Sequence, residues 1–341
     1  MQKRVNIAVI GTGRMGSVHT RNLIRRIPEA NVVAVCDIRL EVAQAVAEEL
    51  GIQRVVRDYH ELLADKDIQA ILIATSTDTH AFIMKDIAAA GKHIFCEKPL
   101  ALDLPSIDDA LAAVDKSGVK LQVGFNRRFD KSFRRVHELV ASGEIGRPCI
   151  LRITNRDPKP PSAEYARVSG GMFLDMTIHD FDMARYQIGE VEEVYAIGNV
   201  LVAPELTDAG DVDTDVVTLR FANGAMGVID NSRQAVYGYD QRLEVFCSAG
   251  VAMAGNEVEN TVVKGVEDGF HSARPPYFFM QRYAECYVDE VREFLECVRD
   301  DTRSAPSITG KDGRMAVVLG YAAWKSLREN RPVKLNEIAA V

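Results

Sequence analysis

The sequence predicts an α/β protein in which a doubly wound parallel sheet is followed by an α+β domain with a large, mostly antiparallel open sheet. Apolar runs alternate with helical patterns as far as residue 123, which is typical of a parallel sheet covered by helices. After residue 124 the apolar residues follow the shorter period of strands. The chain has 341 residues, which is longer than a domain built around a single hydrophobic core usually is. We therefore expect two domains, residues 1–123 and 124–341.

The first strand and the turn after it predict a dinucleotide site. The strand is expected over residues 5–10, and a helical pattern follows the turn. The turn has the spacing G-x-G-x-x-G and consists of Gly11, Thr12, Gly13, Arg14, Met15 and Gly16. Gly11 permits a sharp turn, Gly13 lets a pyrophosphate approach the backbone, and Gly16 lets the helix pack closely on the strand. Unpaired N–H groups at the helix start would bind the phosphates, as in a Rossmann domain.

The second strand indicates which dinucleotide is bound. It is expected over residues 32–36 and ends at Asp37, about 20 residues after the last glycine of the turn. A carboxylate there accepts hydrogen bonds from the adenosine ribose and repels the 2′-phosphate of NADP. Ile38 offers that phosphate no donor, whereas Arg39 could turn towards it. We expect NAD as the cofactor; an Asp that only caps the next helix is the alternative interpretation.

The remaining elements of the first domain extend the parallel sheet. We expect helices over 40–50, 59–63, 80–90 and 104–116, and strands over 55–56, 70–74, 93–96 and 119–123. Ligands bind such sheets at the carboxyl ends of the strands. Thr75 and Ser76 follow the strand over 70–74, so we expect them to line the cofactor cleft.

The second domain shows shorter periodicity and few helices. We expect strands over 149–154, 194–202, 216–221, 225–229, 243–247 and 261–264, and helices over 131–141, 171–188, 277–298 and 315–327. Asn223-Gly224 is a hairpin signal. Residues 216–229 alternate only loosely between apolar and polar, so we expect both faces of the sheet to be covered. Because the helices are too few for this, we expect a homo-oligomer, either a dimer or a tetramer.

Composition and charge exclude several classes of protein. The formal net charge of −8 does not favour nucleic-acid binding. No apolar stretch is long enough to span a membrane, and residues 1–4 lead directly into the first strand, which leaves no room for a signal peptide. The six cysteines are dispersed and form no metal-binding pattern. We expect a cytoplasmic protein with reduced thiols and no metal.

A lysine follows the strand expected over residues 93–96. The tripeptide Glu97-Lys98-Pro99 comes directly after it, which places Lys98 at the ligand-bearing edge of the sheet. The alternative interpretation is a surface lysine in a loop, because most lysines are exposed. A catalytic role for Lys98 is the hypothesis that its position supports.

A carboxylate and an imidazole lie together on the helix expected over residues 171–188. Asp175 and His179 are four residues apart and would share one face of that helix, with Asp182 within reach. A carboxylate beside an imidazole fixes its tautomer and raises its basicity. A surface Asp–His pair or a satisfied interior histidine is the alternative.

These stretches together resemble the Gfo/Idh/MocA group of oxidoreductases, which includes glucose–fructose oxidoreductase, inositol dehydrogenase and rhizopine-catabolism proteins. The resemblance covers nearly the whole chain and rests on Glu97-Lys98-Pro99, on residues 124–130 (GFNRRFD) and on residues 170–182. Within this group, the sequence is most similar to the inositol 2-dehydrogenase branch. The sequence departs from common members of the group at Ser76, where many have proline, at Asn126, often methionine, and at Asn155, often histidine.

The resemblance implies a set of site residues. The implied catalytic residues are Lys98, Asp175 and His179. The cofactor-binding residues expected from the turn, the acid and the strand ends are Gly11, Thr12, Gly13, Arg14, Met15, Asp37, Thr75, Ser76 and Glu97. The implied substrate-binding residues are Asn126, Asn155, Asp157, Tyr237 and Tyr283.

The implied reaction is NAD-dependent oxidation of one secondary hydroxyl of a cyclic polyol to a ketone, with myo-inositol as the expected substrate. His179 would take the proton from oxygen, and Lys98 would donate a hydrogen bond to the developing alkoxide. Asp175 would orient either His179 or a neighbouring substrate hydroxyl. The alternatives are a dehydrogenase of another sugar or sugar acid, a glycosidase that uses NAD transiently, and a non-catalytic regulator that senses NAD.

Overall fold

The computed structural model describes residues 4–339, and the chain divides into two compact units. The first contains the chain up to Asn126 and the returning segment Glu285–Val317. The second contains Arg127–Ala284 and the chain from Val318 onward. Among the described helices, none has the length and apolar character needed to cross a membrane.

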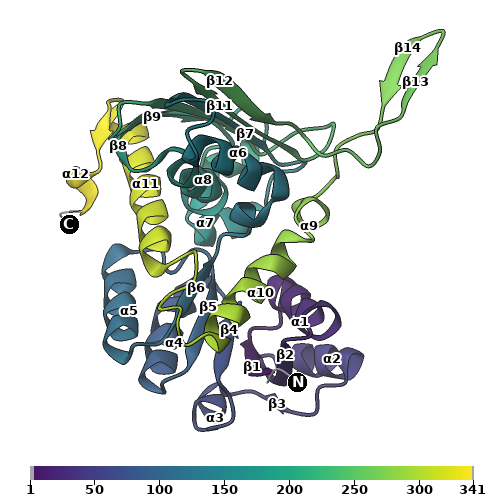
Figure 1. Cartoon of the computed structure of the whole chain (residues 1–341), viewed down its shortest axis with the longest axis vertical. Helices are drawn as coiled ribbons and strands as arrows, with labels where there is room; N and C mark the ends of the chain where they lie inside the picture. Colours follow the sequence, from purple (N-terminus) through teal and green to yellow (C-terminus); the bar gives the residue numbers. More distant parts are fainter. Residues whose placement is uncertain (1–3, 340–341) are drawn as a thin grey trace. The chain divides into compact units, whose positions relative to one another are not determined.

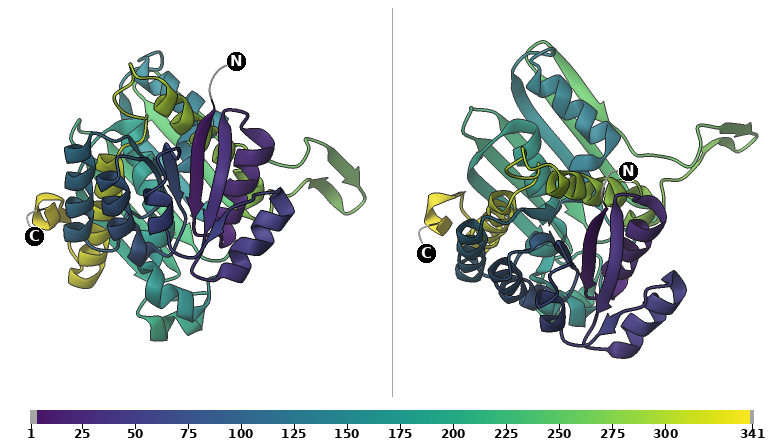
Figure 2. Two further views of the ribbon diagram at one scale, coloured as in Figure 1. Left: turned by 90° about the horizontal axis from the view of Figure 1, so that it is seen from below. Right: turned by 60° about the horizontal axis from the view of Figure 1, so that its bottom comes forward.

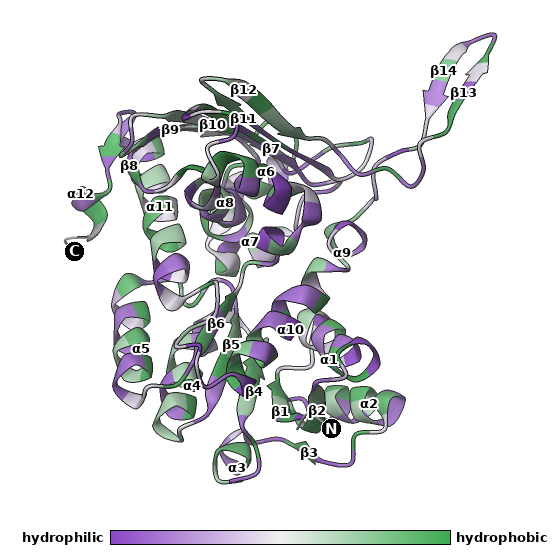
Figure 3. Cartoon of the chain, in the orientation of Figure 1, coloured by the Kyte–Doolittle hydropathy of each residue, from purple (hydrophilic) through white to green (hydrophobic). Residues whose placement is uncertain are grey.

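The first unit is built on a six-stranded sheet in the order β3-β2-β1-β4-β5-β6 (Figure 1). Its strands, all parallel, are β1 (Val5–Ile10), β2 (Ala30–Cys36), β3 (Val55–Val56), β4 (Ala70–Ile73), β5 (His93–Glu97) and β6 (Leu121–Gly124). Helices lie on both faces of this sheet (Figure 2), and every residue of β4 is buried. Figure 3 shows the apolar character of the central strands. The predicted doubly wound parallel sheet is confirmed.

One helix of the first unit comes from far along the chain. The helices of this unit are α1 (Arg14–Arg26), α2 (Leu40–Leu50), α3 (His60–Leu63), α4 (Thr77–Ala89), α5 (Leu104–Ser117) and α10 (Cys286–Arg299). The apolar side chains of Val288, Val291 and Phe294 on α10 join the core formed by β1, β2 and β5. The predicted division at residue 123 places this segment in the second domain, whereas its apolar face packs into the first unit.

The second unit is built on a seven-stranded sheet in the order β12-β11-β7-β10-β9-β8-β15. Its strands are β7 (Pro148–Arg156), β8 (Val191–Asn199), β9 (Thr214–Phe221), β10 (Met226–Ser232), β11 (Asp240–Cys247), β12 (Gly250–Ala254) and β15 (Val333–Lys334). β7 and β10 pair in parallel, and the other neighbours pair antiparallel. The prediction of a large, mostly antiparallel sheet is confirmed.

The two faces of this sheet differ. The helices of the second unit are α6 (Lys131–Ala141), α7 (Ala163–Ser169), α8 (Ile178–Ile188), α9 (Phe279–Arg282) and α12 (Asn336–Ala339), with short turns at η1 (Asn126–Phe129), η2 (Met172–Met176) and η3 (Pro204–Ala209). α6 packs on β11 and β12, and α8 packs on β7. The face away from these helices keeps apolar side chains exposed, namely those of Ile197, Val216, Met226, Phe246 and Met253. We call this the outer face.

Three expected elements take a different form. The strand predicted over 261–264 does not join the main sheet; β13 (Val263–Val266) pairs only with β14 (Gly269–Ser272), in a hairpin that projects from the seven-stranded sheet (Figure 1). The local turn gives each strand a partner without the main sheet. The helix predicted over 277–298 is interrupted between α9 and α10. The last long helix, α11 (Gly310–Glu329), begins before the predicted residue 315.

Candidate active site

The glycine turn has the geometry that the sequence predicts. Gly11 has φ of 88°, and a Cβ there would lie 2.5 Å from the carbonyl oxygen of Ala74. A Cβ at Gly16 would overlap the carbonyl oxygen of Gly11, so α1 packs directly on the turn. A Cβ at Gly13 would meet nothing within 4 Å. The turn therefore leaves open space beside Gly13 at the start of α1, where a pyrophosphate can approach backbone N–H groups.

Asp37 is fixed next to this turn. Its Oδ2 accepts hydrogen bonds from the Thr12 backbone N–H at 2.8 Å and from the Thr12 hydroxyl at 3.0 Å. Its Oδ1 accepts a third from the Arg39 backbone N–H at 2.9 Å. The residue is 8% exposed, while the Arg39 side chain remains largely in solvent. These three hydrogen bonds hold the carboxylate in one orientation at the carboxyl end of β2.

The loops after β4 and β5 are tied together by a buried histidine. His80 on α4 places Nδ1 2.8 Å from the Pro99 carbonyl oxygen and Nε2 3.2 Å from the Thr75 carbonyl oxygen. Burial lowers the pKa of His80, although both carbonyl contacts favour the charged form. The Thr75 hydroxyl lies 2.6 Å from that of Thr79, and Ser76 begins the turn into α4. His80 thus connects the strand ends that carry Thr75 and Lys98, a contact that sequence spacing does not reveal.

The Glu97 side chain points into the core of the first unit. Its Oε1 lies 2.6 Å from Nε2 of His19, a buried residue of α1. Glu290 of α10 is 0% exposed and completes a group in which one ligand-type atom from each residue lies within 4.8 Å of the others. Burial and the nearby Glu97 raise the pKa of Glu290 well above its usual range. Two carboxyl groups and one imidazole therefore lie close together in the core, next in the chain to Lys98, which follows Glu97 and is half-buried.

The helix predicted over 171–188 begins with a wider turn. η2 is a π-helix over Met172–Met176, in which the Thr177 N–H donates to the Met172 carbonyl oxygen, and α8 starts at Ile178. The extra residue follows Gly170 and Gly171, whose φ values of 85° and 72° suit glycine. Asp175 therefore lies on the π-turn rather than on a regular helix face shared with His179.

Asp175 and His179 are the half-buried residues of an otherwise buried stretch from 172 to 184. The Asp175 carboxylate accepts a hydrogen bond from the Tyr165 hydroxyl at 3.0 Å and one from the Arg233 guanidinium at 3.1 Å. Asp182 takes a different role, because it is buried in an ion pair with Arg128. Within residues 172–184, only Asp175 and His179 are partly exposed.

The end of β7 brings Asp157 close to the same carboxylate. Arg233, directly after β10, places Nη1 3.5 Å from Asp157 Oδ2 and 3.1 Å from Asp175 Oδ2. Burial raises the pKa of Asp157, and the Arg233 charge opposes that rise. The structure thus brings two predicted site residues together through an arginine that the sequence did not single out.

Asn155 and Tyr283 are buried inside the second unit. Asn155 is 0% exposed, and its Nδ2 donates to Asp180 Oδ2 at 2.6 Å. Asp180 also binds Arg127 at 2.5 Å, and burial raises the pKa of Asp180 to about 6. Tyr283 is 1% exposed and donates its hydroxyl proton to Gln241 at 3.1 Å. Both side chains are thus engaged with other residues of the second unit, and a substrate contact from either stays a prediction.

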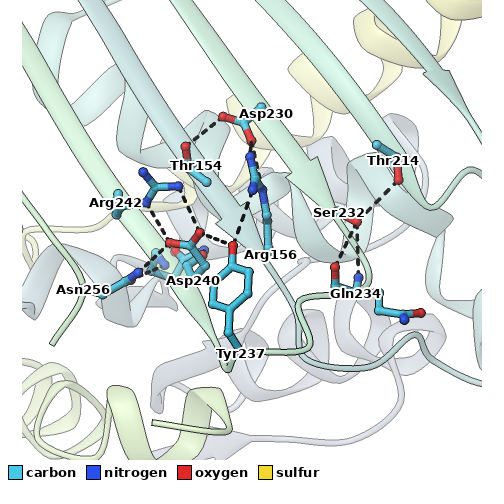
Figure 4. Close-up of polar contacts among 11 residues, drawn as sticks. Thr154, Arg156, Thr214, Asp230, Ser232, Gln234, Tyr237, Asp240, Arg242 and Asn256 are labelled. Atoms are coloured by element: carbon cyan, nitrogen blue, oxygen red, sulfur yellow. Dashed lines mark hydrogen bonds and ion pairs between the residues drawn. The ribbon is translucent and has the colours of Figure 1, made fainter. Parts of the chain in front are cut away.

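Tyr237 lies on the opposite side of the seven-stranded sheet from the Asp157–Asp175 pair. Figure 4 shows the Tyr237 hydroxyl among polar side chains of the outer face, where it donates to Asp240 at 2.7 Å and accepts from Arg156 at 3.4 Å. Arg156 and Asp157 are adjacent on the chain and point to opposite sides of the sheet. Asn126, at the start of η1, is buried. Within the second unit, the Tyr237 side chain is therefore not brought to the predicted carboxylates; a substrate contact from Asn126 stays a prediction.

Comparisons with known proteins place this geometry in a family. Residues 5–125 match the model described as an oxidoreductase family with an NAD-binding Rossmann fold. Residues 133–253 match the GFO/IDH/MocA C-terminal domain. The chain belongs to the Gfo/Idh/MocA family of oxidoreductases. The family resemblance and the NAD-binding Rossmann domain predicted from the sequence are confirmed.

Relatives within this family match almost the whole chain. A protein of Thermotoga maritima named myo-inositol 2-dehydrogenase is 51% identical over 335 residues, covering 98% of this chain and 99% of its own. The crystal structure of a probable dehydrogenase from Thermotoga maritima matches with a TM-score of 0.95 at 51% identity, covering 98% of this chain and 100% of that one. A scyllo-inositol dehydrogenase from Lactobacillus casei, solved with bound NAD(H) and scyllo-inositol, matches with a TM-score of 0.90 at 29% identity, covering 98% of this chain and 100% of that one.

Proposed function

We propose that this protein oxidises one secondary hydroxyl of a cyclic polyol to a ketone with NAD, and that the substrate is myo-inositol, giving 2-keto-myo-inositol. One observation carries the proposal. Asp175 and His179 stay accessible within a buried stretch, in a chain 51% identical over nearly its full length to a protein named myo-inositol 2-dehydrogenase. An imidazole and carboxylates are the groups that alcohol oxidation and polyol recognition need.

The chain's own residues move the proton and stabilise the charge. His179 accepts the hydroxyl proton, because imidazole titrates near working pH. Lys98 donates a hydrogen bond to the alkoxide oxygen as its charge develops. The bound nicotinamide supplies the hydride acceptor. Asp175 is fixed by Tyr165 and Arg233, so we assign it to a substrate hydroxyl rather than to orienting His179.

The first unit holds the cofactor. The open space at Gly13 and the start of α1 receive the pyrophosphate, and Asp37 accepts the ribose hydroxyls. The other proposed cofactor contacts are Gly11, Thr12, Arg14, Met15, Thr75 and Ser76. Glu97 supports this site through the pair it forms with His19.

Substrate recognition centres on Asp157 and Asp175. Ionised carboxylates accept hydrogen bonds only, which suits the hydroxyl groups of a polyol. Asn155 and Tyr283 act behind them, because their side chains are buried and engaged. Direct contacts from Asn126 and Tyr237 stay predictions of the family resemblance.

A second candidate substrate is scyllo-inositol, which differs from myo-inositol in the configuration of one hydroxyl. Relatives named for scyllo-inositol match 97% or more of this chain, one of them at 37% identity and one with that substrate bound. Another sugar or a sugar acid, or a regulator that binds NAD without turnover, would use the same first unit. The regulator needs no accessible Asp175 and His179, and their accessibility disfavours it.

We also propose that the protein is a cytoplasmic homo-oligomer, a dimer or a tetramer. The outer face of the seven-stranded sheet exposes Val216 and Met226 on the neighbouring strands β9 and β10, and Phe246 on β11, which is separated from β10 by β7. Exposed apolar residues grouped on one face are typical of an interface between subunits. A second copy of this chain is the partner that we assign to the outer face.

The experiment that tests the function is a turnover assay at 340 nm with NAD and a panel of polyols. We expect NADH to form with myo-inositol, and to form more slowly with glucose, glucuronic acid and glycerol. The Lys98→Met and His179→Ala variants should bind NAD and lose turnover. Absence of NADH with every polyol, while NAD still binds, would instead support the regulator.

A further inference from the structure

Arg233 is a buried arginine that contacts two carboxylates at once. It follows β10, and its backbone N–H donates to the Asp213 carbonyl oxygen at 2.7 Å. The residue is 3% exposed. Its Nη1 lies 3.1 Å from Asp175 Oδ2 and 3.5 Å from Asp157 Oδ2. One guanidinium nitrogen therefore bridges the end of β7 and the π-turn of η2.

Other charged groups surround this bridge, and two of them are carboxyls. Asp211 accepts backbone N–H bonds from Met172 and Val212 at 2.8 Å each. Burial raises the pKa of Asp211, and it raises the pKa of Asp215 further. Both carboxyls are therefore less readily ionised than exposed aspartates, whereas Asp157 and Asp175 form the ion pairs with Arg233.

A second cation also acts on Asp157 and is already engaged elsewhere. Arg127 lowers the pKa of Asp157 from a distance, while its guanidinium pairs with Asp180 at 2.5 Å. Arg233 contacts both Asp157 and Asp175 directly. Without it, two carboxylates would face each other in a poorly hydrated place, and one of them would bind a proton near neutral pH.

We propose that Arg233 is a positioning residue that keeps Asp157 and Asp175 ionised and fixed as a pair, so that together they accept hydrogen bonds from two hydroxyls of one polyol. This inference rests on the proposed function. A protonated carboxyl would present a donor where a substrate hydroxyl must donate, and the match would be lost. The bridge thus makes recognition depend on two neighbouring hydroxyls rather than on one.

The proposal makes the charge of Arg233 as important as its shape. Arg233→Met keeps an apolar stem and removes the charge, whereas Arg233→Lys keeps a cation. Arg185→Met is the matched control, since the Arg185 side chain is also largely buried in the second unit and binds a carboxylate away from this cluster, that of Glu190, at 2.8 Å. NAD affinity, measured by fluorescence, reports on whether each variant folds.

The test is the pH profile of kcat/KM for myo-inositol. At pH 7 we expect Arg233→Met to lose about 10- to 100-fold, mainly through KM, and to recover part of this as pH rises, because one carboxyl then loses its proton. Arg233→Lys should keep the wild-type profile with a smaller loss. The Arg185→Met profile should keep the wild-type inflection. A loss in Arg233→Met that is independent of pH and equal to that of Arg233→Lys would overturn the proposal.

A second readout does not depend on activity. In protein labelled with ¹³C at aspartate carboxyls, Arg233→Met should show one carboxyl titrating at higher pH than in the wild type, and Asp157→Asn added to Arg233→Met should abolish that change. If the wild type oxidises no polyol but this titration shift appears, the carboxylate pair stands and the proposed function fails. Unchanged carboxyl titration in a folded Arg233→Met variant refutes the bridge itself.

Discussion

Asp37 offers a sharp test of cofactor choice, because the structure fixes its carboxylate beside the glycine turn. Three hydrogen bonds, two from Thr12 and one from the Arg39 backbone, hold both carboxylate oxygens. The perturbation is Asp37→Asn, which keeps the size and one acceptor oxygen and removes the charge. We expect it to weaken the preference for NAD over NADP.

The magnitude follows from the charges. A 2′-phosphate held about 5 Å from the Asp37 carboxylate, at an effective dielectric constant of about 20, costs roughly 3 kcal/mol for each pair of unit charges. This corresponds to roughly 100-fold discrimination or more in the wild type. Asp37→Asn removes this repulsion and also weakens the charge-assisted hydrogen bonds to ribose by about 1 kcal/mol. The NADP efficiency should therefore rise about 10- to 100-fold, while the NAD efficiency falls several-fold.

The assay compares kcat/KM for the two cofactors at saturating polyol in the wild type and in Asp37→Asn. Glu48→Gln is the matched control, because it removes the same charge from an exposed position on α2. Adding Arg39→Ala to Asp37→Asn tests whether the exposed arginine binds the phosphate once the carboxylate charge is gone. An unchanged ratio of the two efficiencies in Asp37→Asn would refute the role given to this residue.

Three further predictions concern the buried acid, the reacting groups and the assembly. The raised pKa of Glu290 means that the folded state keeps a proton that the unfolded state releases above about pH 4.5, so stability falls by up to about 1.4 kcal/mol per unit as pH rises towards the folded pKa. Glu290→Gln should therefore raise Tm more at pH 8 than at pH 5; a constant difference contradicts a neutral Glu290. His179→Ala should lower turnover by about 10²- to 10⁴-fold, and Lys98→Met should also depress it strongly. The double variant should lose much less activity than the product of the two single losses, because both residues act on one transition state. Wild-type turnover should fall as pH is lowered through roughly 6 to 7. Near-full activity in both single variants would contradict a catalytic role for Lys98 and His179. Light scattering should show a dimer or tetramer, and Val216→Lys on the outer face should shift it towards monomer, whereas a wild-type monomer at micromolar concentration removes the proposed interface.

Local spacing predicted the features that depend on nearby residues. The glycine turn, Asp37 and Lys98 each stand at the end of a short apolar strand, and parallel pairing places such ends at one edge of the sheet. The hydrophobic period also separated the parallel first sheet from the mixed second sheet. These features need no knowledge of distant contacts.

The remaining features depend on residues far apart in the chain. Glu97 meets His19 across 78 residues, and Arg233 meets Asp175 across 58. No periodic pattern in the sequence identifies such pairs, because each residue taken alone resembles any other polar residue. The π-turn at η2 comes directly after two consecutive glycines with positive φ. The sequence shows these glycines, but the spacing of apolar residues in a helix does not reveal the wider turn. The return of α10 to the first core likewise needs the packed structure.

The central claim is that a carbon-bound hydrogen of a cyclic polyol passes to NAD. The most direct measurement uses myo-inositol carrying deuterium at carbon 2, with mass spectrometry of the reduced cofactor and of the ketone. We predict that each NADH formed carries one deuterium and that the ketone retains none at that carbon. NADH without deuterium would contradict oxidation at carbon 2, and a lack of NADH with both labelled and unlabelled inositol would contradict the proposed reaction.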